Sequence, residues 1–155
     1  MRFCEQNLCV PVCASADAQA GADGDSFSLE NYQHATFLIM LGALTGDAVL
    51  TINSGAAAAT KTTAETFNYR LGSAAKGSAT ADVLGDEATS AALTLTAADY
   101  QNRLLVVEMD GAELTSGQPW VTLNFSAAAD ALNVAVVAVL SQPRYARQNP
   151  PTAIS

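Results

Sequence analysis

The chain has 155 residues, which suits one domain with a core of its own but is short for two. It carries 15 acidic and 7 basic residues, for a formal net charge of −8, so its surface repels phosphate and nucleic acid is not an expected partner. Its longest apolar runs fall far short of a bilayer-spanning helix, and polar residues interrupt the start of the chain at 5–7. Neither a membrane partner nor a secretory signal is therefore expected.

Residues 1–26 are predicted to form a flexible N-terminal arm. The run ASADAQAGADGDS is small and polar without apolar periodicity, so it buries too little surface to offset its ordering entropy. Cys4, Cys9 and Cys13 are spaced by four and three residues, unlike the C-x2-C pairs of zinc sites, and His34 is the only histidine. Free thiols are the first expectation; a metal site and an interchain disulfide are the alternatives.

Residues 27–140 are predicted to form the domain, because short strand-like runs alternate there with turn residues. The runs are ATFLIML (35–41), AVLTIN (48–53), ETFNYRL (65–71), ALTLTA (92–97), RLLVVEMD (103–110), WVTLNF (120–125) and LNVAVVAVL (132–140). A period of two is typical of half-buried strands. The segment TAADYQNR (96–103) favours one helical turn with Thr96 as its N-cap. Seven or eight such strands predict an all-β fold, an antiparallel β-sandwich that is jelly-roll-like.

The last run is apolar on both of its alternating sides, which predicts a strand between two packed layers. Pro143 lacks a backbone N–H and is expected to prevent further ladder pairing on its side and to steer the chain off the sheet. Residues 141–155, SQPRYARQNPPTAIS, are therefore predicted to form an extended C-terminal arm.

Few side chains point to catalysis. A metal site on a jelly roll would need two or three histidines and a carboxylate, and His34 is the only histidine. We therefore expect His34 to be a solvated or hydrogen-bonded edge histidine. Glu108 and Asp110 share a strand face, as a glycosidase pair could, but only one Trp accompanies them. No catalytic residue, metal or cofactor is predicted, and an enzyme is the last-ranked class. Trp120 could be a binding aromatic, although a core or rim anchor at a strand start is favoured.

The order of several segments resembles small proteins encoded near the capsid genes of tailed bacteriophages. The segments are YQHATFLIMLGAL, DAVLTIN, FNYRLG, LVVEMDGAEL with PWVTLNFS, and AVLSQPRYA; MDGAEL (109–114) and LSQPRYA (140–146) are the most specific. The resemblance covers roughly residues 27–150. Members of this kind with known roles are capsid decoration, or cement, proteins built as jelly-roll-like β-sandwiches.

The resemblance implies a structural virion protein, made in the host cytoplasm, that binds the outer surface of a phage capsid and stabilises contacts between capsomers. Its partners would be the major capsid protein and further copies of itself, as a dimer or trimer. The contact candidates are Pro143, Arg144, Tyr145 and Arg147 of the C-terminal arm together with Trp120, since interfaces favour Arg and aromatic residues. Alternatively, Tyr145 folds back over its own sandwich and the arginines are solvated.

A carbohydrate- or receptor-binding module of a phage tail or fibre is the alternative function. β-Sandwiches host such modules often, so the fold does not decide between the two. This alternative predicts that Trp120 is accessible to solvent.

Overall fold

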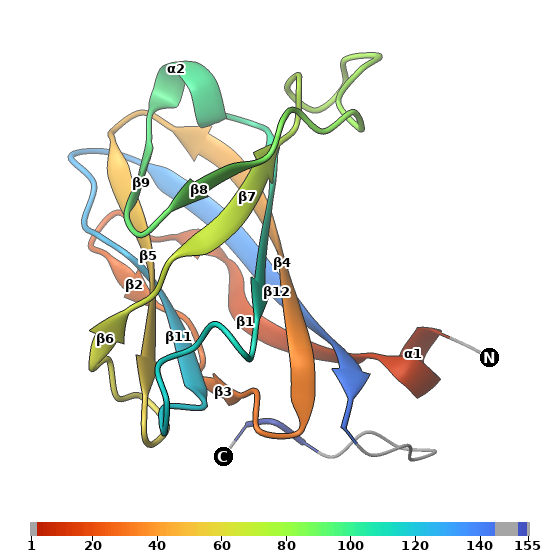
Figure 1. The fold of residues 1–155 in the computed structure, drawn as a ribbon. Helices are drawn as coiled ribbons and strands as arrows, with labels where there is room; N and C mark the ends of the chain where they lie inside the picture. The colour runs from red at the N-terminus through yellow and green to blue at the C-terminus, as the bar shows by residue number, and fades with distance from the viewer. Residues whose placement is uncertain (1–2, 145–151, 155) are drawn as a thin grey trace.

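The computed structural model describes residues 3–144 and 152–154, and two antiparallel sheets pack face to face in it (Figure 1). The first sheet has the order β1 (Leu8–Asp17), β12 (Leu132–Pro143), β4 (Tyr32–Leu44), β10 (Leu104–Asp110), β7 (Phe67–Leu71) and β8 (Ala88–Ser90). The second has the order β2 (Ala22–Asp23), β11 (Trp120–Phe125), β5 (Ala48–Gly55) and β6 (Thr63–Ala64), with β3 (Phe27–Ser28) on β11 and β9 (Leu93–Leu95) on β5. This architecture confirms the predicted all-β, jelly-roll-like sandwich.

Two helices of four residues each complete the described chain, α1 (Phe3–Gln6) and α2 (Ala97–Tyr100). The position of α2 matches the predicted helical turn after Thr96, whose hydroxyl donates a hydrogen bond to the Asp99 carboxylate at 3.0 Å. Neither helix in the described ranges is long and apolar enough to cross a membrane.

The core lies between the two sheets and is built by the period-two pattern. Leu50 and Ile52 of β5 are fully buried on one side, and Phe37 and Ile39 of β4 face them from the other sheet. The rings of Phe27 and Phe37, from β3 and β4, lie 5.6 Å apart and join the two layers. Burying a side chain of this size contributes roughly 1.5–3 kcal/mol, so the core is the main source of stability.

The prediction of a flexible arm over residues 1–26 is wrong for β1. This strand pairs with β12 from Leu8↔Leu140 to Asp17↔Asn133, and the side chains of Val10 and Val12 are buried in the core. Alternate valines give the segment an apolar side, and β12 offers a free hydrogen-bonding edge to receive it.

Gly24 lets the chain cross from the first sheet to the second. A Cβ at this position would overlap the Val12 side chain, and the neighbouring Asp25 N–H donates a hydrogen bond to the Val12 carbonyl at 2.8 Å. The two sheets are thereby joined along this edge.

The predicted start of the C-terminal arm at residue 141 is wrong, although the strand does end at Pro143, as its missing N–H predicts. β12 continues past Leu140, with Ser141 opposite His34 and Pro143 opposite Tyr32. The pairing of β12 with β1 ends at Leu8↔Leu140. Beyond Leu140, β12 is therefore paired only with β4. Proline is tolerated where one edge of a strand carries no ladder.

Part of the predicted C-terminal arm lies against its own sandwich. The Ser28 N–H donates a hydrogen bond to the Ala153 carbonyl at 2.8 Å, and the Ala153 side chain is buried. Tyr145 and Arg147 lie outside the described residues.

The expectation that β12 lies between two packed layers is wrong within the single chain. Its inner side chains, such as Val136 and Leu140, are buried, whereas Val137 on the outer side is 40% exposed. The second sheet covers only one side of the first sheet.

We predict that Cys13 reacts more slowly with iodoacetamide than Cys9, several-fold at pH 8. Burial raises the pKa of the Cys13 thiol, and the nearby Asp25 carboxylate raises it further, whereas Cys9 is exposed. The thiolate is the reactive form, so both burial and pKa slow the reaction. Peptide mass spectrometry after timed labelling gives the two rates, with urea-unfolded protein as the control. Equal rates in the folded protein would show that β1 is detached from the sheet.

Candidate functional site

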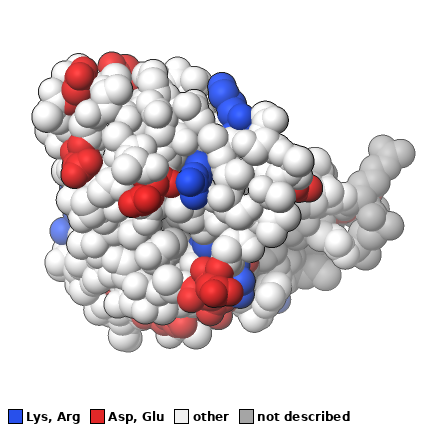
Figure 2. Space-filling view, turned by 90° about the horizontal axis from the view of Figure 1, so that it is seen from above, with Lys and Arg blue, Asp and Glu red and all other residues white. Residues whose placement is uncertain are grey.

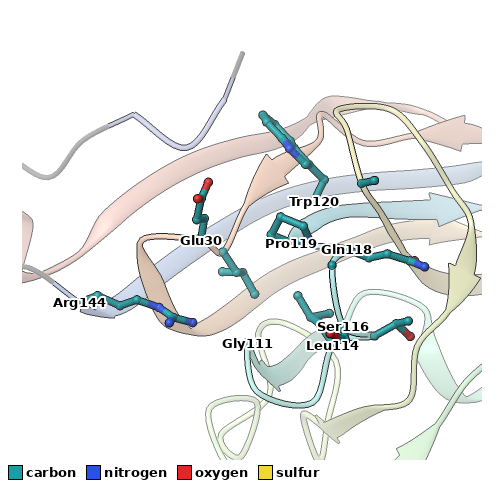
Figure 3. A pocket seen from close by; sticks show the side chains of 12 residues that line it. Glu30, Gly111, Leu114, Ser116, Gln118, Pro119, Trp120 and Arg144 are labelled. Carbon is teal, nitrogen blue, oxygen red and sulfur yellow. The ribbon is translucent and has the colours of Figure 1, made fainter.

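An open hollow of about 370 Å³ lies at one end of the sandwich (Figure 3). Four segments line it together with the start of β11: the turn between β3 and β4, the loop between β5 and β6, the loop between β10 and β11, and the residue that follows β12. Its lining includes Leu29, Glu30, Leu114, Gln118, Trp120 and Arg144. Two of the five contact residues proposed from the sequence, Trp120 and Arg144, therefore meet at this hollow.

Trp120 is held by its backbone on both sides. As the first residue of β11 it pairs with Gly55 of β5 and with Ser28 of β3. The preceding carbonyl, of Pro119, accepts a hydrogen bond from the Leu29 N–H at 2.9 Å. The indole is partly exposed at the rim of the hollow, a position typical of an anchor that a partner can also touch.

Arg144 enters the hollow from the first sheet. Its N–H donates a hydrogen bond to the Asn31 carbonyl at 2.9 Å, and its side chain is exposed. Glu30 lies between Arg144 and Trp120 in Figure 3. Arg144 also lines a neighbouring hollow of about 350 Å³ with Gln142 and Asp110. It thus stands between two depressions on the same end of the molecule.

The remaining candidates are placed differently. Pro143 belongs to β12, opposite Tyr32, and does not line the first hollow. The positions of Tyr145 and Arg147 stay outside the described part of the chain.

A buried carboxylate holds the loop that forms the wall of the hollow. The Ser54 hydroxyl donates a hydrogen bond to Oε1 of Glu65 at 2.5 Å, and the Thr115 N–H donates to the same oxygen at 2.9 Å. The Gln118 side-chain oxygen lies 2.9 Å from the Ser54 hydroxyl. Burial raises the pKa of Glu65, but the hydrogen bonds from Ser54 and Thr115 outweigh it and lower the pKa overall.

Our sequence reasoning missed Glu65, although a signal was present. In ETFNYRL, Glu65 is in phase with Phe67, whose side chain is buried. A period of two therefore points the carboxylate inward, where it needs hydrogen-bond donors.

A second polar cluster lies on the outer side of the first sheet. Asp110 Oδ1 lies 2.6 Å from Nδ1 of His34, and Glu108 Oε1 lies 3.5 Å from Nε2. The Thr36 hydroxyl is 3.2 Å from the same Nε2. His34 is hydrogen-bonded, as expected from the sequence, but the expected edge position is wrong, because β4 is paired on both sides at this residue. Both carboxylates are engaged with the histidine on an exposed face rather than opposed across a cleft.

The cysteines do not meet in a shared site. Cys4, Cys9 and Cys13 are free thiols along α1 and β1. In the described ranges 3–144 and 152–154, no group of three or more His, Cys, Asp and Glu side chains is arranged to hold a metal ion.

The fold has a similar solved structure, whereas the sequence has no match. No family model matches the chain, and no curated protein matches it. The structure is similar to that of the SPBc2 prophage-derived protein YomS, with a TM-score of 0.51 and 10% identity over 88% of this chain and 93% of that one. At this identity the likeness shows the fold alone.

Two virus structures match more weakly. They are Desmodium yellow mottle tymovirus, with a TM-score of 0.30 at 16% identity over 90% of this chain and 87% of that one, and empty particles of cowpea mosaic virus, with 0.24 at 8% over 97% and 93%. Scores of this size add no argument. The class defined by the fold is thus a jelly-roll-like sandwich similar to YomS.

We predict that Glu65→Ala lowers the free energy of unfolding by about 1–3 kcal/mol, because Ser54 and Thr115 lose a buried acceptor. Urea denaturation at pH 7 measures the change. Glu87→Ala is the control, since Glu87 forms an exposed ion pair with Arg70 and its loss should cost less than about 1 kcal/mol. Equal losses in the two variants would contradict the anchoring role of Glu65.

The same variant should change the response to acid. The folded-state pKa of Glu65 is lower than its ordinary value of 4.5, so its contribution to stability is present above that value and is lost as the pH falls through the folded-state pKa. We therefore expect the difference in unfolding free energy between wild type and Glu65→Ala to shrink below about pH 4.5. A difference that stays constant from pH 7 to pH 3 would show that the carboxylate charge contributes nothing.

Proposed function

We propose that this chain is a structural virion protein that binds the outer surface of a phage capsid and stabilises contacts between capsomers. The observation that carries the proposal is that Trp120 and Arg144 line the same open hollow. Trp and Arg dominate the binding energy of protein interfaces when they lie in pockets. The sequence resemblance to phage decoration proteins and the similarity of fold to a prophage-derived protein support the same assignment.

The hollow suits a protein partner. Leu29, Leu114 and Pro119 supply an apolar floor, while Glu30 and Arg144 add one charge of each sign at its rim. A partner side chain can bury apolar surface there and meet a matching charge. The backbone of Trp120 is already fixed by two strands, so little ordering entropy is lost on binding.

The charge of the chain supports a place on the outside of a shell. The net charge of −8 opposes contact with packaged DNA. Figure 2 views the end of the molecule that carries α2, and the Lys and Arg side chains stand apart on it among acidic ones.

The copy number in purified virions tests the proposal. Quantitative mass spectrometry relative to the major capsid protein should give hundreds of copies, near a simple ratio to the shell subunit. A handful of copies per virion would indicate that the protein belongs to a tail or fibre. Absence from the particles would overturn the structural role.

Attachment to shells that lack the protein tests the hollow itself. Trp120→Ala and Arg144→Ala should each weaken attachment about tenfold or more, as interface hot spots do. Lys76→Ala is the matched control, because Lys76 is exposed in the loop after β7, outside the lining of the hollow, and should attach like wild type. Unchanged attachment of both hollow variants, with intact circular dichroism, would remove the hollow from the interface.

A carbohydrate- or receptor-binding module of a tail or fibre remains the second proposal. The partial exposure of Trp120 and the presence of Ser116 and Gln118 in the same lining favour it, since sugars stack on aromatics and hydrogen-bond to polar groups. Trp120 is the only tryptophan, so its fluorescence reports on the hollow directly. A saturable change in emission on titration with a glycan would select this function. Neither proposed function includes a catalytic activity.

A further inference from the structure

We propose that residues 152–154 form a strap that docks on the second edge of β3 and holds one side of the hollow in the position that a partner contacts. The name strap is used here for this segment of three residues. Its positioning residue is Ala153, and the hollow residues that depend on it are Trp120 and Glu30. The inference rests on the proposed function for the partner, but its first two tests use the isolated protein.

The strap extends the hydrogen bonding of the second sheet beyond β3. Successive N–H groups of an extended chain point to opposite edges. On the β11 side, the Leu29 N–H donates a hydrogen bond to the Pro119 carbonyl at 2.9 Å. The preceding N–H, of Ser28, points the other way and donates to the Ala153 carbonyl at 2.8 Å. In Figure 1 the segment that ends at the label C accordingly lies beside β3.

A small side chain anchors the strap. The Ala153 side chain is 6% exposed and belongs to the buried core, whereas Thr152 and Ile154 on either side of it are exposed. The strap has no helix or strand of its own, so its place depends on these contacts. A large charged side chain at position 153 would have to be buried without a partner or displace the strap.

Ser28 links the strap to the hollow. In the pairing of β3 with β11, Ser28 lies opposite Trp120. The Ser28 hydroxyl accepts a hydrogen bond from the Glu30 N–H at 3.2 Å. Both Trp120 and Glu30 line the hollow. One residue therefore contacts the strap through its N–H and positions two parts of the lining, one by strand pairing and one by its side chain.

β3 is too short to hold this position firmly by itself. It has two residues, which pair with Trp120 and Val121. Phe27 is fully buried and its ring lies 5.6 Å from that of Phe37, so the core fixes the first residue. Ser28 is only partly buried at the margin of the sheet. Backbone opens locally most often where few buried contacts hold it, so the strap matters most at Ser28.

The strap is thereby coupled to binding in the hollow. A partner that contacts Trp120 and Glu30 finds both in place only in molecules whose strap is docked, and its apparent affinity falls with the fraction of such molecules. Because coupling is reciprocal, a bound partner also holds the strap in place. Loss of the strap should therefore weaken attachment although no group of the hollow lining has been removed.

Hydrogen exchange of the isolated full chain, followed by NMR, tests the docking of the strap. Ala153→Arg should make the Ser28 amide exchange at least about tenfold faster, because the amide loses its acceptor. A chain that ends at Pro151 should behave in the same way. Thr152→Arg is the matched control, since it adds the same side chain at an exposed neighbouring position and should leave the Ser28 amide as in wild type.

Thermal unfolding confirms that each variant is folded before the comparison. Exchange of the Ser28 amide at the wild-type rate in the chain that ends at Pro151 would overturn the strap, because this variant has no residue 153 to supply the acceptor.

The fluorescence of Trp120, the only tryptophan, tests whether the strap positions the hollow. Ala153→Arg and the chain that ends at Pro151 should shift its emission to longer wavelength and increase its quenching by acrylamide, because the rim of the hollow opens more often. Thr152→Arg and the conservative variant Ala153→Ser should resemble wild type. Unchanged emission and quenching in variants whose Ser28 amide exchanges faster would overturn the positioning role.

Attachment to shells that lack the protein separates this inference from the proposed function. Where wild type attaches, Ala153→Arg should attach about tenfold more weakly, in proportion to the loss of docked strap, and Thr152→Arg should attach like wild type. Weakening by Thr152→Arg equal to that by Ala153→Arg would mean that the strap touches the shell directly, and would overturn the positioning role. A wild type that does not attach would instead overturn the proposed function, while the exchange and fluorescence results still decide the strap.

Discussion

The position of β12 between strands from distant parts of the sequence is the constraint on which the rest of the structure depends. One edge of β12 pairs with β1, from Leu8↔Leu140 onward, and the other pairs with β4 as far as Pro143↔Tyr32. Because both hydrogen-bonding edges are used, the start of the described chain and its last strand are fixed in one sheet. The alternation of β12 then divides its side chains between the core and the side of the first sheet that the second sheet does not cover. Arg144, which directly follows the end of β12, lines the hollow.

The hollow depends on a second constraint, the buried carboxylate of Glu65. A buried charge is tolerated only when hydrogen-bond donors surround it, and Ser54 and Thr115 supply two. These bonds tie the loop between β10 and β11 to the second sheet, and that loop leads directly into Trp120. Trp120 is therefore positioned by the second sheet and Arg144 by the first. A partner seated in the hollow would contact both layers of the sandwich at once.

The sequence predicts much of the sandwich because local alternation fixes where its longer strands lie. The run WVTLNF coincides with β11, and AVLTIN and RLLVVEMD fall within a residue or two of β5 and β10. The first strand escaped prediction because its stability comes from pairing with Leu132–Pro143, far along the chain, and not from its own polar and cysteine-rich composition. The extension of β12 through Pro143 likewise depends on which edge is paired. Residue type alone suggested Trp120 and Arg144, but their meeting at one hollow requires the packing of two sheets and cannot be read from a local pattern.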